Sequence, residues 1–140
     1  MYQASSQIDL FELHDSPVQA IAIRDGQVQL DLEFASIRKE HACNPYHKAQ
    51  TIKPCSLLFQ GVKDQLAQVF SETERVFKPH PDPSSPIDGD IIEFEVAEAT
   101  DQLAVKLAGF HQSGWVEWRF TCSSGQVTWS EFAGSAWYES

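Results

Sequence analysis

The sequence predicts an all-β fold, with at most one short helix, in which an antiparallel meander forms a sandwich or a partly closed barrel. Three observations support this prediction. Apolar and polar residues alternate with a period of two in several segments, turn residues separate these segments at short intervals, and no regular alternation of strands with helices is present. The chain has 140 residues, a size typical of one domain, so residues 1–140 are expected to share a single core.

The first hairpin is predicted around Asp25 and Gly26. An Asp-Gly pair favours a type I′ turn, because both central residues of that turn have positive φ angles. Apolar residues recur at every second position of the segment 27–34, which is therefore predicted to be a strand with one buried face. The segment 18–24 carries two isoleucines on one face and is predicted to be its partner.

A second hairpin is predicted from the segments 92–96 and 103–107, with residues 98–102 as the connection, because both segments alternate in the same way. The segment 56–62 is another predicted strand. Residues 64–70 fit two structures: their apolar side chains have helical spacing, but a continued strand agrees with the pattern nearly as well.

A third strand pair is predicted near the C-terminus. Residues 116–122 alternate, the Ser-Ser-Gly sequence at 123–125 turns the chain, and the return strand starts at Val127. Glu131 interrupts the alternation, so a bulge or the end of the strand is expected near it. Residues 78–90 contain four prolines and are predicted to form a loop.

The chain is acidic, with a net charge of −10 at pH 7. Residues 36–63 carry five basic side chains and one acidic side chain, whereas residues 64–101 carry ten acidic and two basic side chains. Such a chain repels phosphate backbones, so no nucleic-acid partner is expected. The acidic segment would favour a basic protein partner, and the alternative is that its charge serves only solubility.

Targeting and membrane segments are not expected. The longest apolar runs are too short to span a bilayer, so no membrane partner is predicted. The first twenty residues lack a positive start followed by an apolar stretch, which argues against a signal peptide. A cytoplasmic location is therefore expected.

The chain has three cysteines, whereas a disulfide scaffold normally has a larger and even number, so reduced thiols are expected. The best metal candidate is the set His41, Cys43, His47 and Cys55, because zinc accepts these ligand types. Their spacing is not that of a zinc finger, so no metal or other cofactor is assigned. The alternative interpretation is a surface connection that happens to contain two histidines.

Seven residues are predicted to contribute to a binding surface, and none is assigned a catalytic role. His14 beside Asp15 suggests acid–base chemistry, but the following Ser-Pro favours a turn. Asp88 and Asp90 resemble a fragment of a calcium loop that lacks the full pattern, and they are interpreted as part of a turn. Three aromatic residues lie outside the clear apolar faces and are of the kind that anchors interfaces: Trp115, Trp137 and Tyr138.

Three segments, in order, resemble small uncharacterised bacterial domains that open with an "(L/F)HDS" motif. These segments are Leu13–Ser16 leading into the Asp-Gly hairpin, then Cys55–Val62, then Asp88–Glu95. Some relatives of that broad type are similar to immunity proteins of polymorphic toxin systems. The resemblance implies a small β-rich cytoplasmic bacterial protein, and it implies no established reaction, cofactor or catalytic residue.

Three functional hypotheses follow from the sequence. The first is a non-catalytic protein-binding module, similar to an immunity protein, whose acidic surface engages a basic protein. The alternative is a β-barrel that binds a small ligand in an aromatic interior lined by Phe34, Phe94, Trp118, Phe120 and Trp129. The third is a metal-dependent hydrolase that uses His14 or the histidines and Cys43 of the metal candidate. The sequence indicates neither the oligomeric state nor the strand order.

Overall fold

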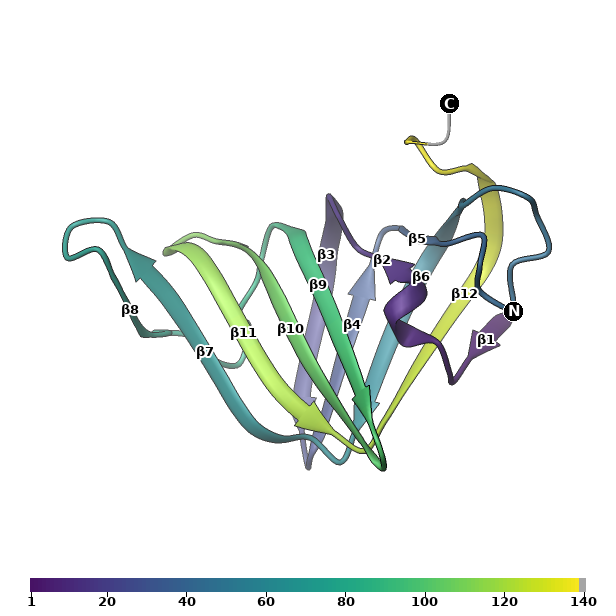
Figure 1. The fold of residues 1–140 in the computed structure, drawn as a ribbon. Helices are drawn as coiled ribbons and strands as arrows, with labels where there is room; N and C mark the ends of the chain where they lie inside the picture. The colour runs from purple at the N-terminus through teal and green to yellow at the C-terminus, as the bar shows by residue number, and fades with distance from the viewer. Residues whose placement is uncertain (139–140) are drawn as a thin grey trace.

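The computed structural model describes residues 1–138 and shows one antiparallel sheet of twelve strands, folded over on itself and not closed into a barrel (Figure 1). In chain order the elements are β1 (Tyr2–Ala4), the 3-10 turn η1 (Ile8–Leu10), β2 (Phe11–Glu12), β3 (Ser16–Arg24), β4 (Gln27–Leu32), β5 (Ala35–Ile37), β6 (Gln50–Gln60), β7 (Lys63–Ser71), β8 (Val76–Pro79), β9 (Asp90–Ala99), β10 (Gln102–His111), β11 (Gly114–Cys122) and β12 (Ser124–Ser135). Within residues 1–138 no helix is long and apolar enough to cross a membrane. The predicted all-β class is confirmed.

The sheet has two halves. One half has the strand order β1-β12-β6-β4-β3, in which β5 also pairs with β6 and β2 pairs with β5, and the other has the order β9-β10-β11-β7-β8. The halves are joined by a short pairing of β3 with β9, where Ser16 lies opposite Ile91 and Pro17 lies opposite Asp90. Because β3 and β9 pair only at this point, the halves can fold over so that their apolar faces meet.

The first two predicted hairpins are confirmed. Arg24 of β3 pairs with Gln27 of β4, and the turn between them has φ angles of 50° at Asp25 and 72° at Gly26, as a type I′ turn requires. Strands β9 and β10 form the second hairpin. Residues 64–70, for which helix and strand were both open, lie in β7 and pair with β11.

The predicted pairing of the two C-terminal strands is wrong. Strand β11 pairs with β10 and β7, whereas β12 pairs with β6 and β1 in the other half. The chain crosses between the halves at Ser123, whose backbone N–H donates to the carbonyl of Gln60 at 2.9 Å. Alternation shows which face of a strand is buried but does not show which strand lies beside it, so it could not predict the partners of β11 and β12.

Three predicted boundaries also change. The strand predicted over 27–34 ends at Leu32, so Phe34 lies outside it. The loop predicted over 78–90 covers residues 80–89, because β8 ends at Pro79 and β9 begins at Asp90. The irregularity expected near Glu131 follows it, between Phe132 and Ser135 of β12.

The core forms where the two halves face each other. Phe59 of β6 contacts Phe120 of β11 with ring centroids 5.3 Å apart, and Phe120 contacts Trp118 at 5.4 Å. Trp118 and Trp129 are fully buried, as the alternation predicted. These contacts remove large aromatic surfaces from water and hold the two halves together.

The strands converge at one end of the molecule, which we call the narrow end (Figure 1). Here the connection from β6 to β7 passes against the connection from β11 to β12. Gly61 has a φ of +67°, and a Cβ added to it would overlap Ser123 Oγ and lie 3.0 Å from Ser123 Cβ. The N–H of Val62 donates to the carbonyl of Gly26 at 2.8 Å, which ties the β3–β4 turn to the same place.

The strands diverge toward the opposite, wide end, and two segments without long strands fill the space between the halves there (Figure 1). The first runs from η1 through β2 to Leu13, and its Ile8, Phe11 and Leu13 are at most 2% exposed. Phe11 contacts Trp129 with ring centroids 5.7 Å apart. The second is the loop 80–89, whose buried Ile87 packs beside Gly109.

The close approach at Gly61 leads to a stability prediction. Gly61→Ala is expected to destabilise the fold by about 1–3 kcal/mol more than Gly26→Ala, because overpacking against the chain at Ser123 is added to the backbone strain. Gly26 is a matched control, since its φ of +72° is similar and nothing lies within 4 Å of an added Cβ. Urea unfolding of both variants measures the difference, and equal losses of stability would contradict the proposed clash.

Candidate functional site

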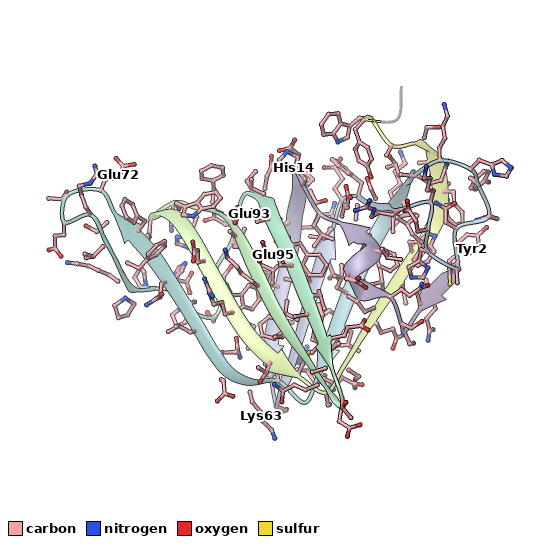
Figure 2. All side chains as sticks on the ribbon, in the orientation of Figure 1. Tyr2, His14, Lys63, Glu72, Glu93 and Glu95 are labelled. Atoms are coloured by element: carbon pink, nitrogen blue, oxygen red, sulfur yellow. The ribbon has the colours of Figure 1, made fainter. Side chains whose placement is uncertain are left out.

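The seven residues predicted to bind all lie at the wide end of the sheet. We call this group, together with Phe110, the rim; its residues are His14, Asp15, Asp88, Asp90, Phe110, Trp115, Trp137 and Tyr138. Figure 2 shows His14 at this end of the molecule and Lys63 at the opposite end. The rim is formed by the β2–β3 turn, the start of β9, the β10–β11 hairpin and the segment that follows β12.

His14 and Asp15 form the centre of the rim. The predicted turn is present, since the N–H of Ser16 donates to the carbonyl of Leu13 and Asp15 has a φ of 63°. The backbone N–H of Asp15 donates to the carbonyl of Ile91 at 2.8 Å, and His14 Nδ1 lies 3.0 Å from the carbonyl oxygen of Ile92. His14 Nε2 and Asp15 Oδ2 are 3.4 Å apart on the exposed surface.

An exposed aromatic pair continues the rim on one side of His14. The His14 and Trp137 ring centroids are 6.3 Å apart, and Trp137 contacts Tyr138 at 5.5 Å. Trp137 is 65% exposed, which is unusual for the largest apolar side chain. The backbone N–H of Ala136 donates to the carbonyl of Ala49 at 2.9 Å and holds this segment against the sheet.

The two aspartates predicted in a turn continue the rim on the other side. The backbone N–H groups of Asp88 and Gly89 both donate to the carbonyl of Phe110 at 3.1 Å, so the turn before β9 is fixed to the end of β10. Asp88 Oδ2 accepts the backbone N–H of Gln112 at 3.3 Å. Phe110 in turn contacts Trp115 with ring centroids 5.3 Å apart.

The rim has unbalanced negative charge. In the described part of the chain, none of Asp15, Asp88 and Asp90 pairs with a lysine or an arginine. Besides the backbone N–H of Gln112, Asp88 Oδ2 faces Nε2 of the buried His111, at 3.7 Å. All three carboxylates belong to exposed residues, so they are available to a cationic group from outside.

Three buried histidines fix the turns around the wide end, a role that the sequence analysis missed. In His41, His80 and His111, ring Nδ1 accepts the backbone N–H of the residue two positions later, at 2.9, 2.8 and 3.1 Å. Nδ1 must then lack a hydrogen, so Nε2–H is the donor: that of His41 donates to the Ser6 carbonyl and that of His80 to the Pro86 carbonyl. These bonds hold the filling segments in place.

The four metal candidates do not form a cluster. Both ring nitrogens of His41 are engaged with backbone groups, Cys43 Sγ lies 3.9 Å from the carbonyl oxygen of Gln3, and His47 is exposed on the loop after β5. Cys55 lies in β6 and is 2% exposed. Within residues 1–138, no group of three or more His, Cys, Asp or Glu side chains is arranged to hold a metal ion.

Comparison of the chain with protein-family models, with curated proteins and with solved structures finds no significant match. The fold and the site define an all-β protein with a twelve-stranded folded sheet and a group of exposed acidic and aromatic side chains at its wide end. The role of that group is therefore argued from its geometry and charge.

The cysteines lead to a reactivity prediction. Burial raises the pKa of the Cys55 thiol to about 12 and that of the Cys122 thiol to about 11, so both stay protonated at neutral pH. Because the thiolate is the nucleophile, we expect a colorimetric disulfide reagent at pH 8 to label only the exposed Cys43 in the folded protein and all three thiols after unfolding. Rapid labelling of the folded Cys43→Ser variant would contradict this expectation.

The pKa of His41 leads to a prediction about pH. Burial lowers this pKa, against the opposing effects of the Ser6 carbonyl and the Asp9 carboxylate. Below about pH 6.5 the unfolded chain therefore binds a proton that folded His41 resists, so the stability present above that pH is lost progressively as the pH falls.

Urea unfolding between about pH 8 and pH 5 tests this prediction. His41→Gln is expected to lower the free energy of unfolding at pH 8 by about 1–2 kcal/mol through lost hydrogen bonds, and this deficit should shrink toward pH 5. His47→Gln, at an exposed position, is the control and should follow the wild type. A constant deficit across the range would show that His41 does not contribute to the pH dependence.

Proposed function

We propose that this chain is a non-catalytic protein-binding module whose rim engages a basic protein. The observation that carries the proposal is that exposed carboxylates and exposed aromatic side chains occur together at the wide end. Within residues 1–138, three exposed carboxylates without a lysine or arginine partner lie at the same end of the sheet as exposed aromatic side chains. Aromatic residues supply most of the binding energy in many interfaces, and carboxylates select a cationic partner and increase its association rate.

The rim is suited to binding because its backbone is already ordered. The turn at Asp15 is hydrogen-bonded to β9, and the turn at Asp88 is hydrogen-bonded to the end of β10. A surface that is held in its binding conformation loses little conformational entropy when a partner docks. Trp137 and Tyr138 add large side chains with few rotatable bonds.

An immunity-type role is the specific form of this function that we favour. A protein of this kind occludes the site of a toxin, so it needs complementary charge and rigid anchors but no catalytic groups. A basic toxin in the cytoplasm would be the partner. This form of the proposal agrees with the sequence resemblance around Leu13–Ser16, and it depends on the rim for its contact surface.

The two other hypotheses gain no specific support. A ligand-binding barrel would need a closed sheet around the interior aromatic residues, but the sheet is not closed, and Trp118, Phe120 and Trp129 are buried against other rings. A hydrolase would need reactive groups brought together. The nitrogens of His41 are engaged with the backbone, and the thiol of Cys55 is buried.

Charge-neutral variants of the rim test the proposal. The triple change Asp15→Asn, Asp88→Asn, Asp90→Asn is expected to weaken binding of a basic partner by about tenfold or more, because three uncompensated carboxylates are lost. The control is Asp25→Asn, Asp64→Asn, Asp101→Asn. It removes the same charge near the narrow end, at positions where all three residues have positive φ angles that asparagine tolerates.

The experiment starts with affinity capture from an extract of the native cell, followed by identification of the captured protein and titration of its purified form against each variant. We expect a partner with a basic isoelectric point, affinity that falls with added salt, and a control triple within about twofold of the wild type. Capture of no specific protein at low salt, or equal affinity of the two triple variants for the captured protein, would contradict the proposal.

A further inference from the structure

A cleft opens beside the rim, between the β7–β8 hairpin and the β10–β11 turn. Its volume is about 540 Å³, within the range of sites that take a ligand group. Its lining residues come from both hairpins and from the start of the loop 80–89, and they include Phe70, Glu72, Lys78 and Trp115. Trp115 belongs to both the cleft and the rim, so the two surfaces are continuous.

Aromatic and proline side chains form part of the cleft wall. Phe70 and Trp115 both line it, and each is backed by a second ring. Phe70 contacts Phe77 and Trp115 contacts Phe110, in both cases with ring centroids 5.3 Å apart. These edge-to-face contacts fix the orientations of the two lining rings, and a planar or apolar group that enters the cleft meets ordered aromatic surface.

The uncompensated charge of the cleft is negative. Glu72 lines it at the end of the β7–β8 hairpin (Figure 2), and within residues 1–138 it forms no ion pair. Lys78, the one basic side chain in the lining, is already held by Glu74. A cationic group entering the cleft would therefore find a free carboxylate beside two aromatic rings.

The edge of the sheet at this place does not favour an added strand. Strand β8 is the last strand in the order, and all four of its residues are exposed. It ends in Lys78 and Pro79, and a lysine and a proline on an edge strand discourage pairing with another chain. The occupant of the cleft is thus expected to be a side chain inserted from the partner, rather than a strand laid along β8.

We propose that this cleft binds an arginine side chain of the basic partner, an inference that rests on the proposed function and names its anchor. A guanidinium group is planar, stacks on aromatic faces and is less strongly hydrated than an ammonium group. It can lie against Trp115 or Phe70 while its N–H groups reach Glu72. A lysine would keep the ion pair with Glu72 but lose the stacking.

Two peptides of equal length and charge can distinguish the contribution of stacking to the affinity from the contribution of charge. Titrations of the full chain with an oligoarginine peptide and an oligolysine peptide at physiological salt are expected to show about threefold or greater preference for oligoarginine. Trp115→Leu should remove this preference, and Glu72→Gln should weaken both peptides by about threefold. Glu131→Gln, an exposed change in the other half of the sheet, is the matched control and should leave both affinities unchanged.

The outcomes distinguish this inference from the function on which it rests. Thermal unfolding of each variant first confirms that it is folded, and Glu72→Gln tests the cleft if Trp115→Leu is not. Equal affinity for the two peptides, or a preference that survives Trp115→Leu, overturns the arginine site. If the arginine site is overturned but the triple Asp→Asn variant of the rim still binds both peptides more weakly than the wild type, the proposed function stands. Absence of binding by both peptides to the wild type overturns the arginine site, and the native partner then tests the function separately.

Discussion

The close passage of two chain connections at the narrow end is the constraint on which the rest of the structure depends. The chain leaves one half of the sheet after β6 and returns to it after β11, and the two crossings lie against each other at Gly61 and Ser123. Only a residue without a Cβ and with a positive φ fits this contact well. The crossings bring Phe59 over Phe120, so the facing of the two halves follows from the same contact.

Convergence at one end requires divergence at the other. The halves separate toward the wide end, and the space is filled by η1, β2 and the loop 80–89, which bury Ile8, Phe11 and Ile87. Such short segments cannot satisfy their backbone groups by strand pairing alone. The buried His41 and His80 supply part of what is missing, because one ring nitrogen accepts a backbone N–H and the other donates to a carbonyl. The filled wide end is therefore an ordered surface.

The interior and the two buried thiols offer little chemistry, so the ordered surface of the wide end is the better candidate for function. The large interior rings contact one another, and the pKa values of Cys55 and Cys122 are raised far above neutrality by burial. Carboxylates, exposed rings and an aromatic cleft meet at the wide end instead. We propose that together they bind a cationic partner, with Trp115 shared between the rim and the arginine site.

The β class, the Asp-Gly hairpin, the positions of most strands and the burial of Trp118 and Trp129 follow from local sequence patterns, because alternation and turn chemistry act between neighbours in the chain. The same patterns pointed to the acidic and aromatic residues that share the rim. The pairing of β12 with β6, the strand at residues 64–70 and the backbone hydrogen bonds of both His41 ring nitrogens emerge only from the folded chain. Those outcomes depend on contacts between residues far apart in the chain, and a local sequence pattern does not indicate such contacts.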